Sequence, residues 1–186
     1  GHDVERPHHA EHGAQQPDHR RNDRHVQQVL DLALQHGRLA GALAFDHTHT
    51  GERLSVVFAV GEHYVPNALD RLNFFLRDHY SGEVGSIDPQ LFDLLFKVKQ
   101  ELACEQPFQV ISGYRCADTN TRLRHTGGGG VAKQSLHMLG KAIDIRIAGV
   151  PLDDLRDAAI SLGVGGVGFY ARSQFVHLDT GRVRSW

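Results

Sequence analysis

Hydrophobic and polar residues follow two different periods along this chain, and the changes of period predict its elements. Between residues 23 and 39, apolar residues recur at the three- and four-residue spacing of a helix that is buried on one side. Residues 39–47 and 53–60 alternate residue by residue, which is typical of strands, and the turn-forming sequence HTHTGE separates them. The chain is therefore expected to begin its fold with a helix and a β-hairpin.

The later part of the chain mixes both periods. Asp88 suits a helix N-cap, because its carboxylate can accept a backbone N–H, and Pro89 fits the first helical turn. Strands and helices do not alternate regularly, which favours an α+β fold with an antiparallel sheet and flanking helices. Helices are expected at residues 66–80, 89–104, 117–125 and 151–162, and strands at residues 107–112, 141–147, 165–170 and 174–179.

The first 24 residues differ in composition from the rest. Five of the 14 histidines lie there, among charged residues and with almost no large apolar side chains. Such a segment cannot bury enough surface to offset the entropy cost of ordering it. We therefore expect a disordered His-rich tail at residues 1–24, either simply solvated or loosely gathering metal ions, and a single domain at residues 25–186.

Overall composition excludes several classes of protein. A chain of 186 residues with 40% hydrophobic content can build one core. The 20 basic and 22 acidic residues give a net charge of −2, so nothing indicates a nucleic-acid partner. No apolar run approaches the roughly 18 residues of a membrane span. We expect a monomer with no membrane-spanning segment.

Asp144 is an unusual residue for the strand at residues 141–147. Side chains alternate along a strand, so the three isoleucines share one face and Asp144 projects from the other. Burying this carboxylate without a partner would be costly. The same alternation at residues 174–179 places His177 and Asp179 on one face.

His137, in the loop before Asp144, completes a possible set of metal ligands with His177. Two imidazoles and one carboxylate leave a coordination position for water, which is the pattern of catalytic zinc. Taken singly, a histidine beside an apolar strand is often structural, and Asp144 can form a salt bridge with Arg115 or Lys141. The combination S-x-H-x(6)-D followed by H-x-D is more specific and predicts a Zn²⁺ site.

The sequences ISGYR, SLHMLGKAID, GGVGFY and FVHLDTGRVRSW resemble those of MepK/YcbK-type murein endopeptidases, in the D-Ala-D-Ala metallopeptidase group. The similarity covers about residues 38–186. It implies a hedgehog/DD-peptidase-like zinc fold, one Zn²⁺ held by His137, Asp144 and His177, and peptidoglycan stem peptides as substrate. It also implies an exported, periplasmic protein whose export signal is absent from this chain.

Many members of that wider group carry a carboxylate general base three residues before the last histidine ligand, where this chain has Gln174. Glutamine cannot take the proton. We therefore assign Asp179 either as the base or as the partner of a zinc-bound imidazole, with a purely structural hydrogen-bond acceptor as the alternative. Arg115 is expected to bind the oxyanion or a substrate carboxylate, unless it only forms a salt bridge.

Several neighbouring residues have two interpretations each. Ser135 either donates to the substrate or caps the local turn. Tyr114 and Tyr170 either line the cleft, where Tyr114 would bind substrate, or pack in the core. Gly140 is expected to let the chain bend into the following strand. The glycine run at residues 126–130 is either a mobile rim of the cleft or a plain connector.

The two cysteines allow two redox states, and the remaining histidines indicate no second metal site. Cys104 and Cys116 are compatible with one disulfide, which would support export, or with two free thiols. His47 and His49 form an H-x-H pair without a nearby third ligand, so we do not expect metal binding there. The other isolated histidines are expected at the surface, namely His63, His79 and His125.

The ligand pattern predicts a zinc enzyme, and the resemblance implies an endopeptidase that cleaves peptide cross-links of peptidoglycan, with 3–3 cross-links as the first candidate and 4–3 cross-links as the second. A D,D-carboxypeptidase that trims stem peptides is one alternative, and it would need a cleft closed at one end. A catalytically silent, zinc-bearing cell-wall binding module is the other, and Gln174 favours it.

Overall fold

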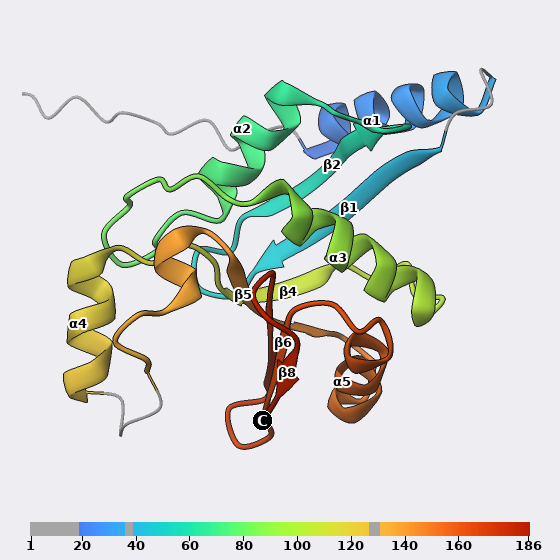
Figure 1. The fold of residues 1–186 in the computed structure, drawn as a ribbon. Coiled ribbons are helices and arrows are strands. Elements are labelled where there is room, and N and C mark those ends of the chain that lie inside the picture. The colour runs from blue at the N-terminus through green and yellow to red at the C-terminus, as the bar shows by residue number, and fades with distance from the viewer. Residues whose placement is uncertain (1–18, 36–38, 127–130) are drawn as a thin grey trace, which may run out of the picture.

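The computed structural model describes residues 19–35, 39–126 and 131–186. These residues form an α+β fold built on one eight-stranded sheet, with the strand order β3-β2-β1-β4-β5-β7-β6-β8 (Figure 1). The predicted strands are all present. Two further short strands, β3 and β8, were not predicted. The bounds of the eight strands are β1 (Ala40–His47), β2 (Arg53–Val60), β3 (His63–Tyr64), β4 (Phe108–Ser112), β5 (Ala142–Ile147), β6 (Gly166–Tyr170), β7 (Phe175–Asp179) and β8 (Arg184–Ser185).

Helices flank the sheet. α1 and α2 pack against the β1–β2 hairpin, α3 packs against β1, and α5 packs against β5, β6 and β7, whereas α4 stands apart from the sheet (Figure 1). No helix in the described residues is both long and apolar enough to cross a bilayer. The helices are α1 (His19–Gln35), α2 (Pro66–Phe75), α3 (Pro89–Glu101), α4 (Ala117–Thr126), α5 (Leu152–Ser161) and the short 3₁₀-helix η1 (Leu136–Leu139).

The sheet is mixed rather than purely antiparallel. β1 pairs with β4 in parallel, and β6 pairs with β8 in parallel, so the predicted antiparallel arrangement is wrong for these two pairs. Parallel neighbours need a crossover of a dozen or more residues, and the connection from β1 to β4 runs through β2, β3, α2 and α3. The other neighbouring strands are antiparallel.

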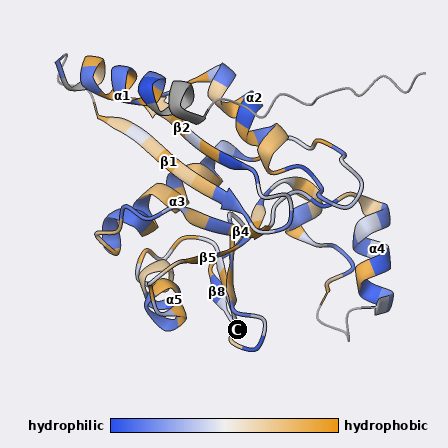
Figure 2. Ribbon diagram, turned by 180° about the vertical axis from the view of Figure 1, so that it is seen from behind, coloured by the Kyte–Doolittle hydropathy of each residue, from blue (hydrophilic) through white to orange (hydrophobic). Residues whose placement is uncertain are grey.

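The core confirms the expected alternation along β5. Ile143 and Ile145 are fully buried in the same hydrophobic cluster as Leu91 and Leu95 of α3. Asp144, between the two isoleucines, faces the other side of the sheet. In Figure 2 the central strands are largely coloured as hydrophobic, while hydrophilic and hydrophobic residues alternate around α1.

α1 begins at His19, inside the segment predicted to be a tail. Arginine is a good helix former, and a helix that already exists gains one hydrogen bond for each residue added. The helix therefore extends upstream of its apolar residues. The remainder of the predicted His-rich tail, residues 1–18, lies outside the described residues, as do the glycines at 127–130.

α2 ends at Phe75, five residues before the predicted end. The reason is Asp78, which is 1% exposed. Its carboxylate accepts backbone N–H groups from Tyr80 at 2.9 Å, Ser81 at 3.3 Å and Cys116 at 2.9 Å. These bonds replace helical ones and tie the segment after α2 to the loop after β4.

Gly140 bends the chain between η1 and β5, as the sequence predicted. It has a φ of 64°, and a Cβ built on it would lie 1.9 Å from the backbone oxygen of Ser86. We expect Gly140→Ala to destabilise the fold by more than the roughly 1–2 kcal/mol that the left-handed conformation alone costs, measured by urea unfolding. Gly149→Ala is the matched control, because Gly149 has a φ of 78° but no atom within 4 Å of its Cβ position. Equal losses in both variants would contradict the steric argument.

Candidate metal centre and active site

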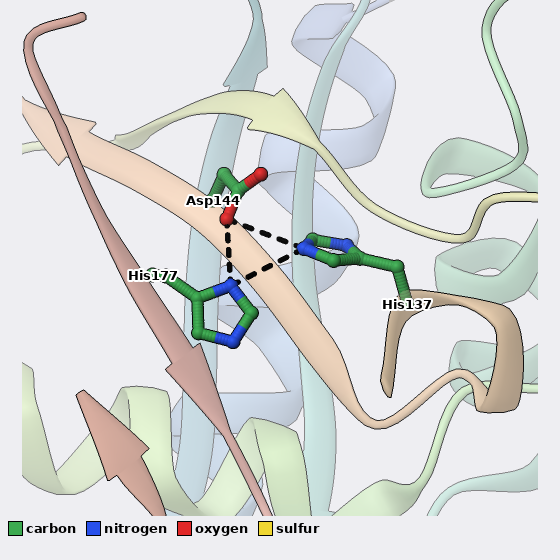
Figure 3. A group of neighbouring side chains, drawn as sticks. All are labelled: His137, Asp144 and His177. Atoms are coloured by element: carbon green, nitrogen blue, oxygen red, sulfur yellow. Dashed lines mark hydrogen bonds and ion pairs between the residues drawn. The ribbon is translucent and has the colours of Figure 1, made fainter. Parts of the chain in front are cut away.

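Three elements bring His137, Asp144 and His177 together. Asp144 of β5 and His177 of β7 are directly paired residues of antiparallel strands, so their side chains lie on the same face. His137 belongs to η1, whose first turn is capped by Ser135, which accepts the His137 N–H at 3.4 Å. Figure 3 shows the three side chains pointing toward one another.

The three inward-facing atoms form a small triangle. His137 Nε2 lies 3.2 Å from Asp144 Oδ1, His177 Nδ1 lies 2.9 Å from the same oxygen, and the two nitrogens are 3.3 Å apart (Figure 3). Ligands bound tetrahedrally at 2.0–2.1 Å from a zinc ion are about 3.3 Å apart. Among the described residues, this is the group whose ligand atoms are close enough to hold a metal ion.

The outward-facing nitrogens define the protonation of the two rings. His137 Nδ1 is 2.7 Å from the backbone oxygen of Gly113, and His177 Nε2 is 3.0 Å from Asp179 Oδ2. A carbonyl and a carboxylate can only accept, so in each neutral ring the outer nitrogen donates and the inner nitrogen carries a lone pair. Two lone pairs and a carboxylate oxygen then face one another, an arrangement that a cation stabilises.

The charges of the site also suit a cation. Burial opposes ionisation of Asp144, but the neighbouring His137 and His177 hold the pKa of this carboxyl well below its usual value. Burial by itself lowers the pKa of His177, yet the hydrogen bonds to Asp144 and Asp179 outweigh it and raise the pKa to about 9. A metal ion must displace this proton, because only the neutral imidazole can coordinate.

Asp179 is fully buried and its carboxylate is surrounded by donors. Oδ1 accepts the backbone N–H groups of Gly166 at 3.0 Å and Gly181 at 2.8 Å. Arg184 donates to both oxygens, at 3.1 and 2.7 Å. Burial opposes ionisation, but these bonds and the one from His177 hold the pKa of Asp179 well below its usual value. The structure therefore places Asp179 behind His177, away from the open side of the site.

Arg115 approaches the centre from the loop after β4. Its guanidinium lies 3.8 Å from Asp144 Oδ2 and donates to Ser112 Oγ at 3.3 Å and Asn120 Oδ1 at 3.4 Å. The backbone N–H of Arg115 donates to the carbonyl oxygen of His137 at 3.2 Å. Of the two interpretations from the sequence, the ion pair is present, and a guanidinium with five N–H groups still has donors for a ligand.

The centre opens into a cavity of 410 Å³. Arg115 and Ser135 line it together with the three candidate ligands, and Tyr170 lies on its wall. Tyr114 is not among its lining residues. The Tyr114 hydroxyl donates to Glu83 at 2.9 Å, and its ring would lie 2.2 Å from a Cβ at Gly85, so Tyr114 packs against the loop before α3.

Among the residues of this cavity that sequence reasoning missed are Arg184 and Trp186. Both lie in the GRVRSW segment, which was used only as a motif of resemblance. Arg184 reaches the site through Asp179, and Trp186 reaches it because β8 pairs with β6 in parallel. Arg184 could have been found from the sequence, because it follows Asp179 by only five residues and carries the opposite charge. The position of Trp186 could not, because it depends on the order of the strands in the sheet.

Comparison with known proteins gives the same answer as the motifs. A family model described as peptidoglycan L,D-endopeptidase MepK matches residues 36–186. The chain belongs to the MepK family. The peptidoglycan L,D-endopeptidase MepK of Escherichia coli (strain K12) is 46% identical over 144 residues, which are 77% of this chain and 79% of that protein. The probable peptidoglycan L,D-endopeptidase MepK of Haemophilus influenzae is 44% identical over 145 residues, 77% of each chain. No solved structure matches.

The cysteines of this MepK-family chain are free thiols, so the disulfide considered from the sequence is wrong. Cys116 is buried at the start of α4, where its sulfur lies 3.4 Å from Thr119 Oγ1. Cys104 packs against the hydrophobic core just after α3. The hydrogen bond from the Cys116 N–H to the Asp78 carboxylate holds the Cys116 thiol in this local environment.

His79 is half-buried, so its predicted surface position is wrong, whereas His63 and His125 are exposed as expected. The ring of His79 stacks on His49 with centroids 4.3 Å apart and lies 5.5 Å from the ring of His47. His47 is only 2% exposed. The early end of α2 produces this histidine cluster, because it turns His79 back toward the hairpin.

Acidification is expected to destabilise the fold through His47. Burial, and then repulsion from His79 and His49, lowers the pKa of His47 from 6.5 to about 4. Below pH 6.5 the unfolded chain binds a proton that the folded protein does not, so stability falls until about pH 4, by about 3 kcal/mol in total. Urea unfolding between pH 7.5 and pH 4 measures this loss. His47→Gln removes the titrating group, and an unchanged pH dependence in that variant would contradict the assignment.

Proposed function

We propose that this protein is a zinc-dependent endopeptidase that cleaves peptide cross-links of peptidoglycan in the periplasm. The observation that carries the proposal is the triangle of His137 Nε2, Asp144 Oδ1 and His177 Nδ1, which has the size of a tetrahedral zinc site and opens into a cavity. The names of the MepK relatives, which describe peptidoglycan L,D-endopeptidases, support the choice of substrate.

Each residue of the centre has a definite task in this proposal. When bound, the ion would polarise the scissile carbonyl and make a water molecule acidic enough to attack near neutral pH. His137 and His177 present their lone pairs because Gly113 and Asp179 hold the outer ring protons. Arg115 binds the negative charge that develops on the carbonyl oxygen, or a carboxylate of the stem peptide, through its remaining N–H groups.

Asp179 is proposed to position His177 rather than to take the proton of the attacking water. Its carboxylate is fully buried and already accepts bonds from two backbone amides, Arg184 and His177. Gln174, at the position of the base in many relatives, lies in an exposed turn with a φ of 56°, and its amide donates to the backbone oxygen of Ala171. Among the described residues that line the cavity, Asp144 carries the one carboxylate.

Digestion of purified sacculi tests the proposed function. Zinc-loaded protein is expected to release uncross-linked muropeptides, chelation is expected to stop the release, and added zinc is expected to restore it. Mass spectrometry of the products distinguishes 3–3 from 4–3 cross-links. Release of terminal D-alanine with cross-links intact would support the D,D-carboxypeptidase instead. Stoichiometric zinc binding without any product would support the binding module.

A further inference from the structure

Three aromatic side chains, Tyr170, Phe175 and Trp186, line one part of the cavity, and we call them the aromatic wall. The rings of Tyr170 and Phe175 are stacked with centroids 4.6 Å apart. Trp186 Nε1 donates to the Tyr170 hydroxyl at 3.0 Å. The ring of Trp186 lies 5.4 Å from the ring of His177, centroid to centroid. The aromatic wall therefore begins directly beside a candidate metal ligand.

The fold holds Trp186 in this position. Its backbone N–H donates to Val167 at 3.2 Å, and its backbone oxygen accepts the N–H of Phe169 at 2.9 Å. A Cβ at Gly168 would lie 2.7 Å from the Trp186 ring and 2.9 Å from the Tyr170 ring, so these rings occupy space that a side chain at Gly168 would need. Trp186 nevertheless keeps 51% of its surface exposed. A rigid, half-exposed aromatic ring provides contact area at little entropic cost.

The charges around the aromatic wall indicate what it binds. The Arg184 guanidinium lies 4.8 Å from the Trp186 ring centroid, but it is paired with the buried carboxylate of Asp179. Arg115 also lines the cavity, on the Asp144 side of the centre, and its guanidinium is less closely neutralised, at 3.8 Å from Asp144 Oδ2 compared with 2.7 Å between Arg184 and Asp179 Oδ2. The aromatic wall thus suits a hydrocarbon part of the substrate, and the Arg115 side suits a carboxylate.

We propose that the aromatic wall binds the methylene chain of the diamino acid whose side-chain nitrogen belongs to the scissile amide. This inference rests on the proposed function. A ring next to His177 can reach only the groups that flank the scissile bond, so the glycan strand is too distant. In a peptide cross-link, the scissile nitrogen is carried by a hydrocarbon side chain, whose first methylene group lies two bonds from that nitrogen.

Tryptophan fluorescence tests this binding without requiring the protein to cleave the ligand. Trp186 is the single tryptophan of the chain, so intrinsic tryptophan emission reports on the aromatic wall alone. The intact zinc-loaded protein is titrated with a stem peptide that ends in the free diamino acid. A saturable change in emission is expected. The shorter L-alanyl-γ-D-glutamate peptide, which lacks the diamino acid, is the control and is expected to cause no change. No response to the first peptide, or equal responses to both, overturns the inference.

Kinetics separate substrate contact from a structural role. On a soluble cross-linked muropeptide, Trp186→Ala is expected to raise KM about tenfold, the factor for about two methylene groups that lose an apolar contact. Trp186→Phe keeps an aromatic face and is expected to stay within about threefold of wild type. Zinc content and kcat are expected to be similar in all three proteins, whereas a merely structural role would lower both in Trp186→Ala.

The outcomes distinguish this inference from the proposed function. If wild-type protein cleaves cross-links and Trp186→Ala keeps the wild-type KM, the aromatic wall does not bind the methylene chain and the endopeptidase proposal stands. If the fluorescence responds selectively to the diamino acid but sacculi release no product, the aromatic wall is supported and the endopeptidase proposal fails.

Discussion

Replacing His137 by alanine is expected to abolish the release of muropeptides from sacculi and to remove the bound metal ion. His137 supplies one of the three candidate ligand atoms, and its Nδ1 anchors the ring to Gly113 at 2.7 Å. We expect activity to fall by more than about 100-fold, the upper range for losing a group that only orients a metal ligand. Zinc content per chain, determined by elemental analysis after dialysis, directly measures whether the metal ion has been lost.

His125→Ala is the matched control for this variant, because His125 is exposed at the end of α4 and lines no part of the cavity. It is expected to keep the zinc content and activity of wild type. Circular dichroism and urea unfolding show whether His137→Ala is still folded. Full activity in a folded, zinc-free His137→Ala protein would rule out the metal centre as the catalytic site.

Asp179→Asn is expected to weaken zinc binding by about 10–100-fold and to destabilise the metal-free protein by about 3–5 kcal/mol. An amide has no net charge, so it leaves Arg184 without its buried counter-ion. Its NH₂ group would also face a donor, because His177, Gly166, Gly181 and Arg184 all donate to the carboxylate. Competition with a chromophoric chelator measures the affinity for zinc, and urea unfolding measures the stability.

Asp157→Asn controls for the loss of one negative charge, because the Asp157 side chain is 65% exposed and forms an ion pair with the neighbouring Arg156. Exposed pairs of this kind contribute little, so wild-type stability and zinc affinity are expected. The kinetic result decides the role of Asp179. A fall in kcat at saturating zinc, with unchanged zinc affinity, would show that Asp179 acts as the general base and not as the residue that positions His177.

The candidate ligands could be found from the sequence because their arrangement follows from strand geometry. Two-residue alternation in KAIDIRI and FVHLD places Asp144 and His177 each on the polar face of its strand. The pairing of β5 with β7 then sets these residues directly opposite each other. The bend at Gly140 was likewise predictable, since glycine tolerates its φ of 64°.

Contacts between distant segments were not predictable in this way. Asp78 ends α2 early because the loop after β4 supplies the N–H of Cys116. That bond joins residues 38 positions apart, and helical periodicity contains no information about it. The same early end produces the histidine cluster, in which His79 stacks on His49. The local sequence pattern predicted a helix as far as Tyr80, but hydrogen bonds to a distant loop end the helix earlier.

By itself, the sequence determined the type and approximate extent of most α-helices and of the six longer strands, the faces of β5 and β7, and the three residues able to hold a metal ion, because these depend on the spacing of neighbouring residues. Only the tertiary structure decided the parallel pairings of β1 with β4 and of β6 with β8. It also decided that Arg184 neutralises Asp179 behind His177, and that Trp186 lies beside the metal centre. The physical reason is that strand order and buried charge pairs depend on which distant segments pack against each other and become buried. The spacing of residues along the chain contains no information about that packing.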